Sequence, residues 1–192
     1  MPPAVTLETD RLLLRPWRDD DREPFFAMSA DPRVSEYLPP FRDRAASDAF
    51  IDRLRADFAA RGWGFWAIER KSDNRFIGMA GMHEPGPEFG VGRACVEIGW
   101  RLEPSAWGRG YATEAAREIL RFGFLEANLP EIVSFTALGN TRSFAVMERL
   151  GMRREPETFD LLLLPEGHPH RPHCLYSLKR EAWLARHGGT LS

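Results

Sequence analysis

The sequence is poor in several features that mark particular protein classes. It has two cysteines, Cys95 and Cys174, which stand far apart and in no metal-ligand spacing. Such sparse usage suits a reducing compartment rather than a secreted disulfide scaffold. The longest aliphatic run, residues 161–164, is far too short to cross a bilayer. The first residues lack the basic and apolar segments of a signal peptide, so we expect none and predict a cytoplasmic protein.

Charge of one sign is also missing, since 26 Lys and Arg stand against 28 Asp and Glu, a formal net charge of −2. A duplex-binding protein usually shows a basic excess, so we expect neither a nucleic-acid partner nor a membrane partner. The 192 residues show no internal repeat and no low-complexity linker. This length predicts a single domain over residues 1–192, large enough to bury about 70% of its unfolded surface without disulfides or metal.

Hydrophobic spacing predicts an alternation of strands and helices. Apolar residues at steps of three and four, such as Ile51, Leu54 and Phe58, indicate amphipathic helices, and short apolar runs between turn residues indicate strands. A strand, a helix and another strand in succession predict a parallel pair inside a mostly antiparallel sheet, which is an α/β (α+β) architecture. The expected strands are 12–14, 65–68, 76–82, 95–102, 132–138, 152–159 and 174–178, and the expected helices begin at 19–21, at about 43, at 112, after Asn140 and near Trp183.

The most informative stretch is residues 107–114, Trp-Gly-Arg-Gly-Tyr-Ala-Thr-Glu, between a predicted strand and a predicted helix. Gly108 and Gly110 permit a tight turn whose backbone N–H groups join the helix N-terminus in an anion cradle. The Gly-Lys-Ser/Thr of a Walker A loop is absent. A dinucleotide fold would need a third glycine at Thr113 and an acidic residue at the end of the next strand. A loop that binds the pyrophosphate of an acyl-CoA fits better, although a plain turn would also use these glycines.

The sequence resembles the GNAT superfamily of N-acetyltransferases, whose loop reads Gln/Arg-x-x-Gly-x-Gly/Ala. Residues 107–112 match it, with Trp107 in the first position and Ala112 in the last. Further segments are similar to the RimJ/RimL branch, and together they span nearly the whole chain. These segments are Leu-Glu-Thr-Asp-Arg-Leu at 7–12, Glu-Ile-Gly-Trp-Arg-Leu at 97–102, Asn-Thr-Arg-Ser at 140–143, Leu-Gly-Met at 150–152 and Leu-Tyr-Ser-Leu at 175–178.

This resemblance implies the GNAT fold, with the sheet splayed at its central parallel pair, flanked by helices and filled there by acetyl-CoA. It implies backbone contacts to pantetheine from the strand before the loop and pyrophosphate contacts from the loop itself. We also expect Arg101 and Arg109 to form a small basic spot for the anionic cofactor. The predicted cofactor-binding residues are Trp100, Arg101, Leu102, Trp107, Gly108, Arg109, Gly110, Tyr111, Ala112, Thr113, Asn140 and Ser143.

The proton chemistry of the implied reaction points to two catalytic candidates. At pH 7 an α-amine costs about 1 kcal/mol to deprotonate and a lysine about 4–5 kcal/mol, so a base matters most for lysine-type acceptors. Glu97, in an otherwise apolar strand, stands where the superfamily often has its base, although it could also be an outward-facing strand residue. The tyrosine that many members use as acid is replaced by Met147. The resemblance to this branch implies Ser143 as the proton donor, although serine also suits the first turn of a helix for purely structural reasons. Asn140 can cap its helix, contact pantetheine, or do both.

The remaining candidates concern the acceptor and metals. Tyr37 and Phe41 flank residues 38–40 between the first two helices, a connection that often walls the acceptor cleft in this family. His83 ends a strand and is a further candidate for the acceptor site, with an ordinary core or surface histidine as the alternative. His168, His170 and His173 lie close in sequence, but Pro169 and Pro172 interrupt them, so we predict no metal site.

The resemblance implies direct transfer of an acetyl group from acetyl-CoA to a primary amine in a ternary complex. The amine would belong to a protein N-terminus or to a small molecule, and a homodimer is plausible in this family. An alternative keeps the fold without catalysis, as a CoA-binding sensor or interaction module. A third interpretation, a nicotinamide-dependent oxidoreductase, predicts NAD binding instead.

Overall fold

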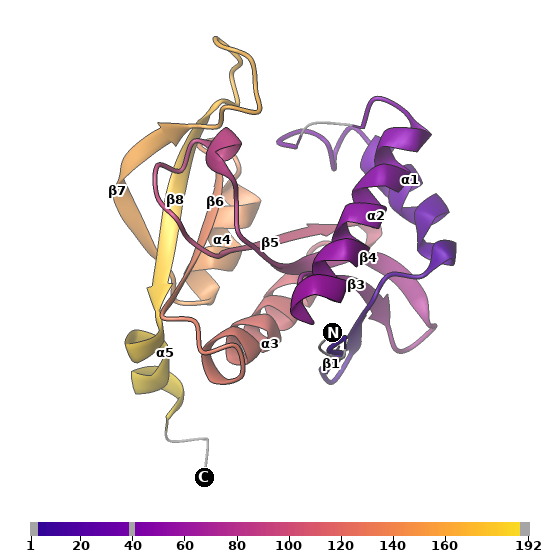
Figure 1. The fold of residues 1–192 in the computed structure, drawn as a ribbon, viewed down its shortest axis with the longest axis horizontal. Helices are drawn as coiled ribbons and strands as arrows, with labels where there is room; N and C mark the ends of the chain where they lie inside the picture. Colours follow the sequence, from indigo (N-terminus) through magenta and orange to yellow (C-terminus); the bar gives the residue numbers. More distant parts are fainter. Residues whose placement is uncertain (1–3, 39–40, 189–192) are drawn as a thin grey trace. The chain divides into compact units, whose positions relative to one another are not determined.

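A computed structural model describes residues 4–38 and 41–188 of the chain (Figure 1). Pro39 and Pro40, in the connection named above, lie outside the described residues. The strands are β1 (Leu7–Glu8), β2 (Leu12–Arg15), β3 (Phe65–Arg70), β4 (Arg75–His83), β5 (Glu97–Leu102), β6 (Glu131–Ala137), β7 (Arg153–Asp160) and β8 (Pro172–Lys179). The α-helices are α1 (Arg22–Ala30), α2 (Arg44–Arg61), α3 (Tyr111–Leu125), α4 (Thr141–Arg149) and α5 (Arg180–His187).

The chain divides into two compact units, which share strand β5 and helix α3. The first comprises the residues up to Met82 together with Gly99–Glu118, and the second comprises His83–Ile98 together with the residues from Ile119 onward. The strand order is β1-β2-β3-β4-β5 in the first unit and β5-β6-β8-β7 in the second. The prediction that residues 1–192 form one domain stays a prediction.

The sheet is mixed, as predicted, because β5 and β6 run parallel while β2–β3, β3–β4, β6–β8 and β7–β8 run antiparallel. The parallel register consists of Glu97 opposite Val133, and the Val133 N–H donates to the Val96 carbonyl over 2.9 Å. The pairing is therefore confined to the beginning of β5. Helices accompany the strands in both units, which gives the α+β class that the sequence predicts.

Helix α2 shows how local sequence sets the boundaries of an element. Asp43 is its N-cap, and its carboxylate accepts a hydrogen bond from the Ala46 N–H over 2.8 Å. Gly62 ends the helix in the left-handed conformation at φ 81°, which glycine adopts without steric cost. Between these ends Ile51, Leu54 and Phe58 are buried. They extend the core of the first unit, in which Trp17, Phe25 and Met28 also lie.

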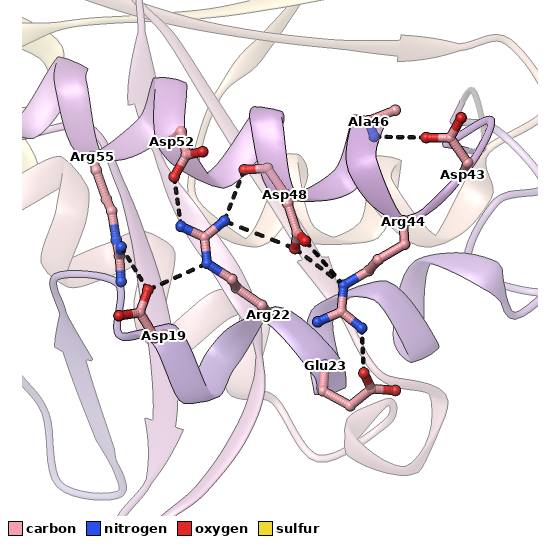
Figure 2. Close-up of polar contacts among 9 residues, drawn as sticks. All are labelled: Asp19, Arg22, Glu23, Asp43, Arg44, Ala46, Asp48, Asp52 and Arg55. Carbon is pink, nitrogen blue, oxygen red and sulfur yellow. Dashed lines mark hydrogen bonds and ion pairs between the residues drawn. The ribbon is translucent and has the colours of Figure 1, made fainter.

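A ladder of ion pairs joins α1 to α2 at the surface of the first unit (Figure 2). Arg22 reaches Asp19 at 3.3 Å and Asp52 at 2.5 Å, and Asp19 also accepts from Arg55 at 2.8 Å. Further along, Arg44 bridges Asp48 and Glu23. Exposed pairs of this kind contribute little individually. Together they connect the beginning of α1 to one side of α2.

A second charged network of the first unit is buried. The Arg15 guanidinium lies 2.7 Å from Asp21 and 2.7 Å from Glu69, with the three side chains between 3% and 10% exposed. Asp21 additionally accepts the Arg18 backbone N–H over 2.7 Å. The acidic run at 19–21 does begin a helix, as a 3-10 turn that leads into α1. Its third member is buried and ion-paired rather than solvated.

The close approach of β4 and β5 in the first unit depends on Gly78. Its φ is +147°, and a Cβ at this position would overlap with the Arg101 carbonyl oxygen. A side chain at residue 78 would therefore push Arg101 and its neighbours away from β4. This glycine lies inside a strand that the sequence predicts correctly, but its packing role has no sequence signal.

The second unit is an antiparallel sheet of β6, β8 and β7 with helices packed on it. The ring centres of Phe144 in α4 and Tyr176 in β8 are 6.1 Å apart, and those of Trp183 in α5 and Phe124 at the end of α3 are 5.6 Å apart. The predicted strand at 95–102 begins two residues later than expected, at Glu97. Strand β1 and the 3-10 turn at Pro87–Phe89 were not anticipated, because two- and three-residue elements carry no detectable period.

Candidate active site

The glycine-rich loop has the conformation of an anion cradle. Gly108 and Gly110 have φ values of 71° and 80°, both in the left-handed region, and α3 begins at the next residue, Tyr111. A loop that alternates in this way turns successive backbone N–H groups toward one side, next to the positive end of a helix dipole. A Cβ on Gly108 would have no neighbour within 4 Å, so the space over this position is open. The residues present therefore fit a bound phosphate group.

The loop is held in place by contacts from the turn between β1 and β2. Glu114, in the first turn of α3, accepts hydrogen bonds from the Thr9 hydroxyl at 2.6 Å and from the Arg11 Nε at 2.6 Å. Arg11 Nη1 donates to the Arg109 carbonyl at 3.0 Å, and its guanidinium lies 4.6 Å from the centre of the Tyr111 ring. These hydrogen bonds hold the pKa of Glu114 below its usual value, against the opposing effect of burial. We call Thr9, Arg11 and Glu114 the loop clamp.

The other predicted cofactor residues of the first unit surround this loop. The Trp107 indole N–H donates to the Leu102 carbonyl over 2.9 Å, which ties the loop to the end of β5. Thr113 is buried, and Ala112 and Trp100 are half-buried. Arg109 is exposed and donates to the Ser105 carbonyl at 3.2 Å, whereas Arg101 donates to the Ser29 hydroxyl of α1 at 3.3 Å. The two arginines have different surroundings, and the expected joint basic spot stays a prediction.

Two predicted residues of the second unit meet directly. His83 Nε2 lies 2.7 Å from Glu97 Oε2, with the Glu97 side chain 9% exposed and that of His83 23% exposed. The strand register thus brings the proposed base and the proposed acceptor-site histidine into one hydrogen-bonded pair. Such a pair orients a carboxylate and offers a route for a proton. Sequence reasoning named both residues without foreseeing their contact.

Asn140 and Ser143 occupy the beginning of α4. The Asn140 Oδ1 accepts the Ser143 N–H at 3.2 Å, and its Nδ2 donates to the Thr136 hydroxyl at 2.9 Å. The predicted helix cap is confirmed, and each polar atom of the amide keeps capacity for one more hydrogen bond. Ser143 is half-buried in the first turn, and Met147, one turn further along, is fully buried.

Comparison with known proteins decides the family. Residues 11–153 match the acetyltransferase (GNAT) domain family. The chain belongs to the GNAT acetyltransferase family. It is 30% identical to the uncharacterized N-acetyltransferase YnaD of Bacillus subtilis (strain 168), over 92% of this chain and 98% of that protein.

Two further relatives widen this comparison. The FsC-acetyl coenzyme A-N(2)-transacetylase of Aspergillus fumigatus is 30% identical over 93% of this chain and 78% of its own length. The crystal structure of an acetyltransferase from Agrobacterium tumefaciens str. C58 superposes with a TM-score of 0.73 at 31% identity, covering 91% of this chain and 94% of that one. The chain is thus a GNAT acetyltransferase in both sequence and fold.

The acceptor-site candidates of this GNAT chain lie in different units. The centre of the Phe41 ring lies 5.6 Å from that of Phe25 in α1 and 5.3 Å from that of Phe50 in α2. Phe41 therefore joins an aromatic cluster with these two helices. Tyr37 is half-buried. His83 belongs to the second unit, where Phe89 lies 5.4 Å from its ring. Among residues 4–38 and 41–188 no group of three or more His, Cys, Asp or Glu could hold a metal ion. In that same part of the chain, no helix is long and apolar enough to span a bilayer.

A feature that the sequence did not indicate is the aromatic cluster beyond His83. Phe135 lies 6.0 Å from Phe89, 5.5 Å from Phe159 and 6.2 Å from the buried His173. Burial lowers the pKa of His173, although the Arg171 carbonyl, 3.0 Å from its Nδ1, opposes the shift. His173 therefore belongs to a packed aromatic layer.

The buried His173 predicts a specific acid sensitivity. Because its pKa is lowered on folding, the folded state resists the proton that the unfolded chain takes up near pH 6.5, so stability falls as pH drops below that value. The expected slope is at most about 1.4 kcal/mol per pH unit. Urea unfolding at pH 7.5, 6.5 and 5.5 should show this loss in the wild type and a smaller loss in His173→Phe. His187→Phe, at an exposed histidine, serves as control, and equal slopes for all three proteins would contradict the assignment.

Proposed function

We propose that the chain transfers the acetyl group of acetyl-CoA to a primary amine by direct attack within a ternary complex. The observation that carries the proposal is the loop before α3, where two left-handed glycines and a helix N-terminus form an anion cradle. The relative from Aspergillus fumigatus, whose name states an acetyl-CoA-dependent N(2) transfer, supports the same donor. Acetyl-CoA would supply the activated thioester, and Gly108–Ala112 would hold its pyrophosphate.

We propose Glu97 as the general base that relieves the amine of its proton, directly or through a water. The His83 imidazole, 2.7 Å away, orients this carboxylate and is positioned to share the proton. The backbone of β5 near Trp100, Arg101 and Leu102 would hydrogen-bond the pantetheine arm, and its N–H groups would polarise the thioester carbonyl.

Ser143 is the proposed donor of the proton that the departing CoA thiolate takes up. Its position in the first turn of α4 also favours a negatively charged neighbour, because the helix dipole stabilises a thiolate there. Asn140 would use its remaining donor on the pantetheine while it keeps its cap. Met147 has no exchangeable proton, so it takes no part in this step.

The acceptor and the cellular setting are also proposals. The motifs at 97–102 and 140–143 favour the RimJ/RimL branch, and hence a protein N-terminal α-amine or a small-molecule amine as acceptor. Tyr37, Phe41 and His83 are the proposed acceptor contacts. The sparse cysteines and balanced charge favour a cytoplasmic enzyme that acts without nucleic acid or membrane. A homodimer is proposed on the family resemblance alone.

A thiol-release screen tests the function. Acetyl-CoA and the protein are mixed with peptides, diamines, amino acids and aminoglycosides, and free CoA is measured. We expect release with at least one class, and we expect CoA to raise the melting temperature while NAD does not. At 100 times Kd a bound ligand adds about 2.7 kcal/mol of stability. Stabilisation by CoA with no release from any amine would favour a non-catalytic binding module, and stabilisation by NAD alone would favour the oxidoreductase.

A further inference from the structure

Arg101, at the end of β5, is a cation without a counterion. Its Nη1 donates to the Ser29 hydroxyl at 3.3 Å, and its Nε is enclosed without a hydrogen-bond partner in the described chain. No carboxylate of residues 4–38 or 41–188 forms an ion pair with it, whereas Arg15, a buried arginine of the same unit, has two such partners. One neutral hydroxyl does not compensate the desolvation of a guanidinium.

The surroundings of Arg101 are aromatic rather than acidic. Its guanidinium carbon lies 5.9 Å from the centre of the Phe25 ring and 5.7 Å from that of Phe41. Burial lowers the pKa of Arg101 to about 10, so the group still carries its charge at neutral pH. Arg101 thus places a positive charge against two aromatic rings, one from α1 and one from the segment before α2.

The geometry of this site selects a class of ligand. Aromatic rings beside a guanidinium hold its plane and leave the N–H groups at its edge as the available donors. An edge with two parallel N–H groups matches the two oxygens of a carboxylate, which it binds as a bidentate pair. Arg101 as a residue is half-buried, and Nη1 and Nη2 form the edge opposite the enclosed Nε. Phe41 beside it is one of the proposed acceptor contacts.

We propose that Arg101, oriented by Phe25 and Phe41, binds a carboxylate of the acceptor, so that the acceptor is an amine that also bears a carboxylate. This inference rests on the proposed acetyl transfer and narrows its substrate class to amino acids and acidic peptides rather than simple amines. The other possible source of the anion is a phosphate of CoA. The loop before α3 already offers a separate cradle for those phosphates, which favours the acceptor.

Matched amine pairs provide the test. L-lysine is compared with cadaverine, L-ornithine with putrescine, and a C-terminally amidated peptide containing glutamate with the same amidated peptide containing glutamine. In each pair that the enzyme acetylates, we expect kcat/KM to be at least about tenfold higher for the amine with the carboxylate than for its partner without it. A charged bidentate contact contributes that much or more. Arg101→Met should abolish the preference, and Arg75→Met, at an exposed arginine of the same unit, should preserve it.

A binding measurement separates failure of this inference from failure of the proposed function. Calorimetry in the presence of CoA should show that the carboxylate-bearing amines bind the wild type at least about tenfold more tightly than Arg101→Met, even without turnover. The Kd for CoA should change by less than about tenfold, because the pantetheine contact proposed for Arg101 uses its backbone, which methionine keeps. The melting temperature of Arg101→Met should be equal or higher, because an uncompensated charge is removed. Equal kcat/KM and equal Kd for both members of every pair would overturn the inference while leaving acetyl transfer intact.

Two other outcomes have different meanings. A tenfold weaker CoA affinity in Arg101→Met would overturn the inference in favour of the cofactor phosphate. The absence of any thiol release would overturn the proposed function instead.

Discussion

Replacing Glu97 with glutamine is expected to lower kcat/KM for a lysine-type amine by about 10²- to 10⁴-fold at pH 7, the usual contribution of a general base. Glutamine preserves the size of the side chain and can still hydrogen-bond His83, but it cannot accept a proton. The loss should shrink as pH rises toward 10, because an amine with a pKa near 10.4 then loses its proton without help. Steady-state rates of thiol release from pH 7 to 10 measure both effects.

The matched control for this experiment is Glu131→Gln in the adjacent strand β6. Glu131 is also partly buried, but its carboxylate pairs with Arg93 at 2.6 Å and takes no part in the proposed chemistry. Glu131→Gln should change kcat/KM by less than about twofold, because its ion pair with Arg93 is partly exposed to solvent and contributes only a few tenths of a kcal/mol. His83→Gln should lower the rate less than Glu97→Gln does. A pH-independent loss in Glu97→Gln would show a structural role and contradict its assignment as the base.

Replacing Arg15 with methionine is expected to destabilise the fold by about 3–5 kcal/mol, the usual cost of leaving buried charges without their partner. Asp21 and Glu69 would then lie close together in the interior with Arg18 as their remaining basic neighbour. Such a loss is a large fraction of the 5–15 kcal/mol that typical domains have. Equilibrium unfolding in urea at pH 7 measures it through the change in midpoint at constant slope.

Arg22→Met provides the comparison that makes this result interpretable. Arg22 also contacts carboxylates, Asp19 and Asp52, but both of these are well exposed in the ladder of Figure 2. Its loss should cost less than about 1 kcal/mol, because water solvates the partners left behind. Substituting all of Arg15, Asp21 and Glu69 by apolar residues should recover much of the stability that Arg15→Met loses. Equal effects of Arg15→Met and Arg22→Met would contradict the buried-network interpretation.

Local features of the chain were predictable from sequence, because they depend on neighbours along the chain. The N-cap at Asp43, the cap at Asn140 and the turn at Gly108 and Gly110 each follow from the conformational preferences of one or two residues. The parallel pair follows from a strand, a helix and a strand in succession. Element boundaries were accurate to about two residues wherever a period of two or 3.6 extended over a full element.

Contacts between distant segments were not predictable in the same way. Nothing near Glu114 in sequence indicates that Thr9 and Arg11, more than 100 positions away, hold its carboxylate. The same is true of Arg101, whose aromatic neighbours come from α1 and from the segment before α2. A single sequence shows which residues are chemically unusual. Only the folded structure shows which of them lack a hydrogen-bond or ion-pair partner.

The loop clamp has a thermodynamic consequence for ligand binding. A glycine-rich loop loses more conformational entropy on ordering than any other kind of segment. Here Arg11 and Glu114 hold the loop in its cradle shape without a ligand, so that entropy is lost when the protein folds and not when the cofactor arrives. Binding then proceeds to a rigid, preorganised receptor. In the proposed complex, the affinity for the nucleotide end of acetyl-CoA would in this way be set partly by two residues that need never contact it.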